Sequence, residues 1–368
     1  MASTINVGVI GVGQIGKRHV AEYAEMADVR IVALADLNQA EAQRVAAQHG
    51  IPTTYANFRD LLANPEIEAV DVCLHNNFHA PVSVAALEAG KHVFCEKPIA
   101  GTYNDALKMI EARERTGQRL AVQIATLFSA ETKAARRIID AGLLGRRYYA
   151  RAVFMRRRGR PFVDGYGTAS FVQKAVATGG ALIDVGIYQL GQVLYLLDNP
   201  EVLTISGSTY QELDMHAGRR ESSGFDVEEM GLGFVRLAGG VTLDVEISWA
   251  QHYEGGESSK VLGSKGGLKL DPLGFYTGVA DMELSGSLDL RGAEFRFHSV
   301  EPDYNGFDSP QKHWIASLQG RVSAIDTAQL ALNAALISEG IYLSARLGRE
   351  VTPAEVRQYS QSTAIWSV

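Results

Sequence analysis

The sequence predicts an α/β fold in two domains. Residues 1–125 alternate apolar, β-rich runs with helical patterns, which is typical of a parallel sheet with right-handed crossovers. Later runs such as 148–155 and 240–249 are β-rich and joined by glycine-containing turns, which indicates a mostly antiparallel sheet. The chain has 368 residues, and a single core rarely grows beyond about 250–300 residues. We therefore expect a parallel α/β domain over 1–125 and an α+β domain with a large open sheet over 126–368.

The individual elements follow from the period of the apolar residues. Period-2 runs bounded by turn residues predict strands, and apolar residues three and four apart predict helices. In the first domain we expect strands at 5–10, 29–35, 69–74, 92–95 and 120–124, with helices at 15–26, 39–48, 57–63, 79–89 and 103–116. In the second we expect a helix at 129–141, strands at 148–155, 202–210, 229–237, 240–249, 258–263 and 267–270, and helices at 179–197 and 326–346.

The first strand ends in a glycine pattern, Gly11-x-Gly13-x-x-Gly16, and a helical pattern follows. Gly11 permits a tight turn, Gly13 allows the backbone to approach a pyrophosphate, and Gly16 lets the helix pack on the strand. The helix N-terminus offers free N–H groups to the phosphates. The pattern therefore predicts a Rossmann dinucleotide-binding domain, with the pyrophosphate on Gly13, Gln14 and Ile15. The alternative is an ordinary glycine turn.

The second strand ends in Asp36, 20 residues after Gly16. A carboxylate there accepts hydrogen bonds from a ribose diol and repels a 2′-phosphate. No Arg or Lys directly follows it. The sequence therefore favours NAD over NADP, although Asp36 or Asn38 could instead serve as a helix N-cap.

Ligands of parallel sheets bind beyond the carboxyl ends of the strands. We therefore expect further cofactor contacts from the segments after the third and fourth predicted strands. The candidates there are Leu74, Asn76, His79, Glu96 and Lys97.

Lys97 lies where this rule places a nicotinamide ring. A cation there can hydrogen-bond a substrate hydroxyl and stabilise the alkoxide that develops during oxidation. Pro98 follows, and X-Pro bonds can be cis. The alternative is a surface lysine at a strand end.

Asp184 and Tyr188 lie four residues apart on an otherwise apolar predicted helix, so they would share one face. A phenol near a lysine has a lowered pKa and can act as a general base. The alternative is a buried tyrosine whose hydroxyl bonds Asp184.

Composition bounds the function. A net charge of −7 argues against nucleic acid as a partner, and no apolar run reaches the roughly 20 residues of a membrane span. The first predicted strand begins too early to leave room for a signal peptide. Cys73 and Cys95 lie at the ends of predicted buried strands, which favours reduced thiols in the core. We therefore expect a cytoplasmic protein. No residues cluster with metal-ligand spacing, so we expect no metal.

These motifs together resemble the Gfo/Idh/MocA oxidoreductases, which include glucose–fructose oxidoreductase and inositol dehydrogenase. The resemblance runs from the glycine pattern through Asn76-x-x-His79 and Glu96-Lys97-Pro98 to Gly179-Gly180-x-Leu182-x-Asp184-x-Gly186 and the final Ser344–Arg349. It implies that Lys97 is the active-site lysine and Asp184 its partner carboxylate. Many members carry His four residues after that Asp, whereas Tyr188 resembles the branch in which Tyr is the acid/base. The resemblance also implies a homodimer or homotetramer formed through the C-terminal sheet.

Two departures concern the substrate. His75 stands where members usually have Pro, and it either touches nicotinamide or substrate or only fills the proline's space. The Arg common after the fifth strand is absent near 126–128. A basic run, 156–160, resembles a segment of some sugar dehydrogenases, so Arg158 and Tyr166 either line the substrate pocket or belong to a solvated or interface loop.

The sequence thus predicts an NAD-dependent dehydrogenase that acts on a secondary hydroxyl of a sugar, glycoside, inositol or sugar acid, with C3 of a glucoside as one option. Lys97, Asp184 and Tyr188 are the catalytic candidates. One alternative is a captive NAD that is recycled within a single catalytic cycle, as in sugar–sugar oxidoreduction or in oxidation-assisted elimination or glycoside cleavage. Another is a non-catalytic NAD-binding regulator.

Overall fold

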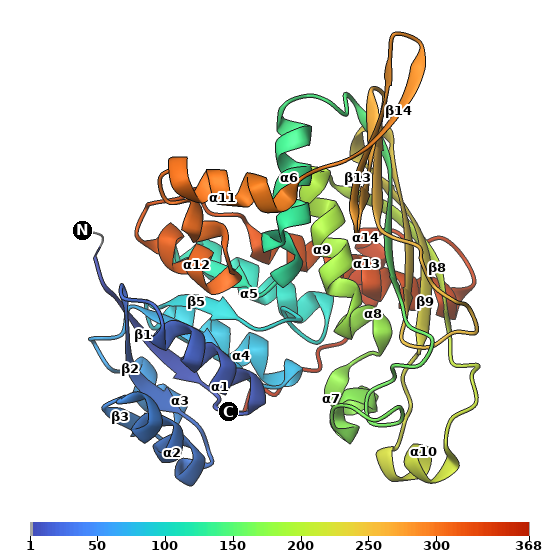
Figure 1. Cartoon of the computed structure of the whole chain (residues 1–368). Coiled ribbons are helices and arrows are strands. Elements are labelled where there is room, and N and C mark those ends of the chain that lie inside the picture. Colours follow the sequence, from blue (N-terminus) through green and yellow to red (C-terminus); the bar gives the residue numbers. More distant parts are fainter. Residues whose placement is uncertain (1–2, 368) are drawn as a thin grey trace. The chain divides into compact units, whose positions relative to one another are not determined.

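The computed structural model describes residues 3–367, which form two compact units (Figure 1). The first unit runs to Gln123 and also includes Glu301–Gln329 and the segment from Ser362 onward. The second comprises Ile124–Val300 and Leu330–Gln361. Two late segments of the chain therefore belong to the N-terminal unit. The division of roles between 1–125 and 126–368 stays a prediction.

The first unit is built on a six-stranded parallel sheet in the order β3-β2-β1-β4-β5-β6. The strands are β1 (Ile5–Ile10), β2 (Val29–Ala35), β3 (Thr53–Tyr55), β4 (Ala69–Val72), β5 (His92–Cys95) and β6 (Leu120–Val122). Ile10 pairs with both Ala35 and Val72, so β1, β2 and β4 end side by side. All loops that follow these strands therefore meet at one edge of the sheet.

Helices cover this sheet in the connections between strands. They are α1 (Gln14–Ala24), α2 (Gln39–His49), α3 (Phe58–Leu62), α4 (Asn76–Glu88) and α5 (Tyr103–Thr116). The late segment adds η4 (Tyr304–Phe307) and α12 (Pro310–Leu318). Trp314 and Ile315 of α12 join the core around Phe94. The buried carboxylate of Asp105 accepts the backbone N–H groups of Thr363 and Ala364, which attaches the C-terminal segment to α5.

The second unit contains an eight-stranded sheet in the order β14-β13-β12-β11-β7-β10-β9-β8. The strands are β7 (Arg147–Met155), β8 (Val202–Tyr210), β9 (Met230–Leu237), β10 (Val241–Ser248), β11 (Lys260–Gly263), β12 (Gly266–Leu270), β13 (Leu273–Val279) and β14 (Met282–Ser287). Only β7 and β10 pair in parallel, and every other pair is antiparallel. The α/β class with a Rossmann sheet and a large, mostly antiparallel sheet is therefore confirmed.

One face of the larger sheet is packed against helices, including α6, α8 and α9 (Figure 1). The helical segments of this unit are η1 (Ala125–Phe128), α6 (Ala130–Asp140), η2 (Ala169–Val172), α7 (Lys174–Ala177), α8 (Ala181–Asp184), α9 (Gly186–Leu196), α10 (Ala217–Ser223), η3 (Ala238–Gly240), α11 (Leu290–Val300), α14 (Pro353–Tyr359) and α13 (Thr327–Leu347) from Leu330 onward. The opposite face carries Tyr149, Arg151, Phe234 and Glu246, which are half-buried or exposed. In residues 3–367 no helix is long and apolar enough to cross a bilayer.

One predicted helix differs from the structure in a way that matters for the site. The expected helix over 179–197 is interrupted at Val185, where φ is −111° and ψ is −23°. Asp184 therefore ends α8 while Tyr188 lies in the first turn of α9, so they do not share the face of one continuous helix. The prediction was wrong because the four residues of α8 and the eleven of α9 are both mostly apolar, so their sequence pattern is that of one continuous helix.

Candidate active site

The glycine loop after β1 depends on the conformation and the small size of its glycines. Gly11 has φ +93°, and a Cβ on it would lie 2.3 Å from the carbonyl oxygen of Cys73. A Cβ on Gly16 would lie 1.9 Å from the carbonyl oxygen of Gly11, whereas a Cβ on Gly13 would meet no atom within 4 Å. Gly11 and Gly16 are thus required by the fold, and Gly13 faces open space at the N-terminus of α1. The N–H groups of that turn can approach an anion.

Asp36 lies at the end of β2, beside this loop. Its Oδ2 accepts the backbone N–H of Val12 at 2.8 Å, and its Oδ1 accepts the N–H of Asn38 at 2.8 Å. The helix N-cap of α2 is Asn38, whose side chain accepts the N–H of Glu41. Asp36 is therefore a carboxylate fixed against the glycine loop, which fits a ribose diol.

The loops after β4 and β5 are connected by His79. Its ring is fully buried, with Nδ1 2.6 Å from the carbonyl oxygen of Pro98 and Nε2 2.9 Å from that of Leu74. Burial lowers the pKa of His79, although both carbonyl contacts and Glu96 oppose the shift. In this structure His79 joins two loops, and a direct cofactor contact stays a prediction. Asn76 begins α4, and His75 before it is exposed.

Lys97 follows β5 at the same edge of the sheet, and its side chain is half-buried. The Lys97–Pro98 peptide is cis. Glu96 accepts the backbone N–H of Lys97 on Oε2 at 2.9 Å. Burial would raise the pKa of Glu96, but the hydrogen bond and charge of His19, together with Lys97, hold it below the ordinary value. Glu96 is therefore a buried carboxylate that fixes the backbone at Lys97.

In the second unit, Asp184 is held by a tryptophan. The indole Nε1 of Trp249, at the end of β10, donates to Oδ2 of Asp184 at 3.2 Å. The hydroxyl of Thr126 donates to the backbone carbonyl of Tyr188 at 2.8 Å. Asp184 and Tyr188 are both half-buried. The carboxylate of Asp184 and the backbone of Tyr188 are thus held by contacts from the residue after β10 and from η1.

The contacts of Glu228 explain why a glycine is needed at position 180, before Asp184. A Cβ on Gly180 would lie 1.9 Å from the carbonyl oxygen of Glu228. The carboxylate of Glu228 accepts the N–H groups of Gly180 and Leu182 at 2.8 and 3.0 Å, and the hydroxyl of Tyr342 at 2.8 Å. Burial raises the pKa of Glu228, and these three hydrogen bonds oppose the shift. Glu228 therefore caps the short helix that ends in Asp184.

The basic run 156–160 divides into different roles. Arg160 is fully buried, and its guanidinium bonds Asp164 and Glu229 at 2.9 Å each, so it holds the loop together. Arg158 is exposed. Tyr166, which is 40% exposed, donates its hydroxyl to the carbonyl of Gly159. Arg158 and Tyr166 stay candidates for substrate contacts, whereas Arg160 is structural.

The structure thus groups the predicted residues by unit. Gly11, Gly13, Gln14, Ile15, Gly16, Asp36, Leu74, His75, Asn76, His79, Glu96 and Lys97 follow the strands of the first unit, and Arg158, Tyr166, Asp184 and Tyr188 lie in the second. The sequence analysis missed Trp249, Thr126 and Glu228. Trp249 was visible only as the end of an apolar strand, because its bond to Asp184 spans 65 residues of sequence.

Comparison with known proteins supports the same reading. The family model "Oxidoreductase family, NAD-binding Rossmann fold" matches residues 5–124, and the model "GFO/IDH/MocA C-terminal domain" matches 132–269. D-glucoside 3-dehydrogenase of Escherichia coli (strain K12) is 31% identical over 284 residues, which cover 75% of this chain and 80% of that protein. Inositol 2-dehydrogenase of Salmonella typhimurium (strain LT2) is 36% identical over 146 residues, 39% of this chain and 43% of that protein.

A solved structure shows the same fold. It is levoglucosan dehydrogenase in complex with NADH and levoglucosan, with a TM-score of 0.76 and 22% identity over 95% of this chain and 99% of that one. With the two family models together covering more than half of the sequence, the predicted fold, cofactor and enzyme class are confirmed. The chain belongs to the Gfo/Idh/MocA family of oxidoreductases and carries that family's NAD-binding Rossmann fold.

Proposed function

We propose that this protein is an NAD-dependent dehydrogenase that oxidises a secondary hydroxyl of a sugar, glycoside, inositol or sugar acid. The observation that carries the proposal is the position of Lys97: it follows β5 at the sheet edge where the glycine loop and Asp36 also lie. A glucoside oxidised at C3 is a specific option, because a 31% identical relative is a D-glucoside 3-dehydrogenase.

The residues of the first unit fit NAD. The turn at Gly13 admits the pyrophosphate, and Asp36 offers carboxylate oxygens to the adenosine ribose. Bound NAD supplies the acceptor for the hydride that leaves the substrate carbon. We infer that the N-terminal unit binds the cofactor and that the second unit supplies the substrate-binding groups.

We assign roles to the catalytic candidates by their chemistry. The ammonium of Lys97 donates to the reacting oxygen and stabilises negative charge as it develops there. The phenol of Tyr188 takes the hydroxyl proton as general base. Asp184, fixed by Trp249, accepts a hydrogen bond from a neighbouring substrate hydroxyl and orients the ring. Positioning of this kind can supply roughly 7–11 kcal/mol of the barrier reduction.

We also propose a homodimer or homotetramer formed through the exposed face of the larger sheet. That face carries Leu232 and Phe234 beside Arg151 and Glu246, around a cavity of about 670 Å³. Phe234 is 41% exposed. Light scattering measures the mass of the native protein and of the Phe234→Glu variant. We expect the variant to have a smaller mass, and an unchanged oligomeric mass would contradict the proposed interface.

The function is tested by absorbance of the reduced nicotinamide band. The dialysed protein is mixed with a panel of glucosides, levoglucosan, inositols and sugar acids, with and without free NAD. Continuous growth of the band with free NAD supports the dehydrogenase and names its substrate class. A change limited to one equivalent per subunit indicates a captive cofactor instead. Tight NAD binding without any change across the panel contradicts the proposal.

A further inference from the structure

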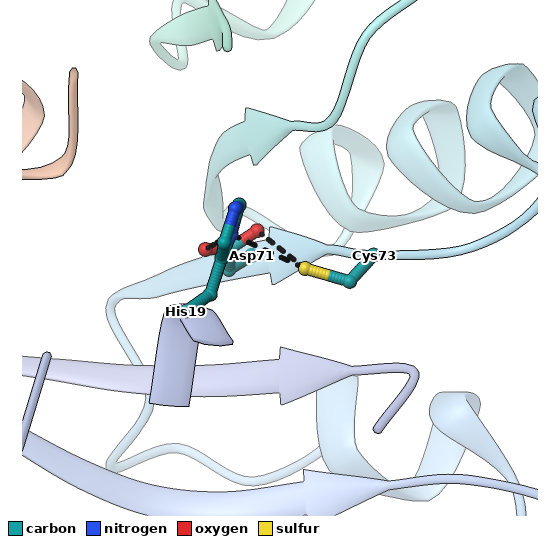
Figure 2. A group of neighbouring side chains, drawn as sticks. All are labelled: His19, Asp71 and Cys73. Carbon is teal, nitrogen blue, oxygen red and sulfur yellow. Dashed lines mark hydrogen bonds and ion pairs between the residues drawn. The ribbon is translucent and has the colours of Figure 1, made fainter. Parts of the chain in front are cut away.

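A group of ionisable side chains is buried between α1 and β4, next to Glu96. His19 of α1 is 1% exposed and Asp71 of β4 is 0% exposed. Figure 2 shows the His19 ring, the Asp71 carboxylate and the Cys73 thiol pointing toward one another. The cluster is continuous with Glu96, because His19 Nε2 lies 3.1 Å from Oε1 of Glu96.

His19 links two carboxylates through its two ring nitrogens. Nδ1 lies 2.8 Å from Oδ2 of Asp71, opposite the nitrogen that meets Glu96. An ionised carboxylate only accepts hydrogen bonds, so both ring nitrogens donate and the ring is an imidazolium. Burial alone lowers the pKa of His19, but the charge and hydrogen bonds of Asp71 and Cys73 raise it far above the ordinary value. Buried charges of this kind are stable only when they are paired.

The same donor set could be read as a metal site, since the His19, Asp71 and Cys73 donor atoms lie within 4.8 Å of one another. The geometry favours hydrogen bonds instead. Cys73 Sγ donates to Oδ1 of Asp71 at 3.2 Å. Burial and the charge of Asp71 raise the pKa of Cys73, so it is a thiol, whereas metals bind the thiolate.

Other side chains surround the cluster, and Glu96 connects it to the backbone of Lys97. Tyr23 of α1 and Phe94 of β5 pack beside His19 and Asp71. Gln311 of α12, oriented with its oxygen toward His19 and its nitrogen toward Glu22, covers the remaining side. Glu96 uses Oε1 for His19 and Oε2 for the backbone N–H of Lys97. Asp71, His19, Glu96 and the Lys97 peptide therefore form one hydrogen-bonded chain from the sheet core to the site.

We propose that His19 is a positioning residue: as a buried imidazolium anchored on Asp71, it holds the Glu96 carboxylate in the orientation that fixes the backbone, and hence the ammonium, of Lys97. This inference rests on the proposed function of Lys97. It assigns a catalytic effect to a side chain that cannot touch cofactor or substrate, because it is buried.

Two matched substitutions separate positioning from packing. In His19→Gln the amide nitrogen replaces Nε2 and keeps a donor toward Glu96, whereas in His19→Asn it replaces Nδ1 and keeps only the donor toward Asp71. Both remove the positive charge. We expect His19→Asn to lower kcat at least about tenfold relative to His19→Gln, while their KM values for NAD and their midpoints of thermal unfolding agree. Equal kcat values for the two variants would overturn the proposal.

A spectroscopic readout separates this proposal from the proposed function. The backbone amide proton of Lys97 resonates downfield when it donates to a well-placed carboxylate. We expect that NMR shift to be retained in His19→Gln and lost in His19→Asn, and we expect both ring N–H protons of His19 in the native protein. Loss of the shift in both variants, or retention in both, overturns the role of His19. A protein that oxidises no sugar but shows the expected shifts refutes only the proposed function.

Discussion

The indole of Trp249 donates its N–H to Oδ2 of Asp184 across 3.2 Å. Trp249 is fully buried after β10, so the surrounding core fixes the ring and hence the donor. One carboxylate oxygen of Asp184 is therefore occupied from within the second unit. This contact makes the orientation of Asp184 a property of the larger sheet rather than of its own short helix.

Replacing Trp249 with phenylalanine should reduce catalysis. The ring still fills most of the core space, but the donor is lost, and a hydrogen bond to a charged group is worth about 1.5–3 kcal/mol. We expect kcat/KM for the sugar to fall about tenfold or more, measured by steady-state kinetics. Trp314→Phe is the matched control, because the buried Trp314 Nε1 has no hydrogen-bond partner. Equal losses in both variants would contradict the role of Trp249.

Much of the candidate site could be predicted from sequence because its motifs are local. The glycine pattern, Asp36 and Lys97 each directly follow a strand, and parallel strands bring their carboxyl ends to one edge. The supporting contacts are not local. In the sequence, His19 is a single polar residue in a predicted helix, and nothing near it indicates its partner Asp71, which lies 52 residues away. Their pairing depends on sheet register, which no short pattern encodes.

Two glycines of the same loop should respond differently to alanine. Gly16→Ala places a methyl 1.9 Å from the Gly11 carbonyl, so we expect a loss of about 1–3 kcal/mol in unfolding free energy. Gly13 has φ −62° and open space at its Cβ position, so Gly13→Ala should fold normally. Its methyl should instead obstruct the pyrophosphate and raise the Kd for NAD. Calorimetry and NADH fluorescence titration check both. Normal NAD affinity in Gly13→Ala would refute the placement of the pyrophosphate.

Asp36 should control the choice of cofactor. In Asp36→Ser the carboxylate that we propose binds the ribose is lost, and with it the repulsion of a 2′-phosphate. We expect the KM for NAD to rise about tenfold and use of NADP to emerge, with kcat little changed. Asn38→Ala is the control, since it removes the cap of α2 and leaves Asp36 in place. Equal use of NAD and NADP by the native protein would contradict the assignment.

His313 should make the fold sensitive to mild acid. Its Nε2 accepts the N–H of Ile325 at 3.0 Å, and burial lowers the pKa of His313 to about 4. The unfolded chain, with a pKa near 6.5, binds more protons in this range, so stability falls as pH falls from 6.5 towards 4. We expect the protonation of His313 to lower the free energy of unfolding by about 2 kcal/mol between pH 7 and pH 5. Urea unfolding of the native protein and His313→Gln at both values checks this; identical pH dependence would disprove it.

The fold was predictable where strands are apolar and buried. Val7 and Val9 of β1 and Leu34 of β2 are fully buried, and their runs read plainly as strands. The hairpin of β13 and β14 was missed because its outer residues, such as Met282 and Leu284, are exposed and follow no inside–outside alternation. The break at Val185 was missed because both flanking helices are apolar. Contacts from distant strands, such as Glu228 on Gly180, decide where that helix begins.

The central claim is that Lys97 acts in hydride transfer more than in holding NAD. The most direct measurement compares Lys97→Met with the native protein, using single-turnover growth of the reduced nicotinamide band and fluorescence titration of NADH. Because the ammonium stabilises charge only as the hydroxyl is oxidised, we expect the rate to fall by about 10²–10³ while the Kd for NADH changes less than about threefold. A variant that retains native turnover, or loses NADH binding in proportion to its rate, would contradict the account.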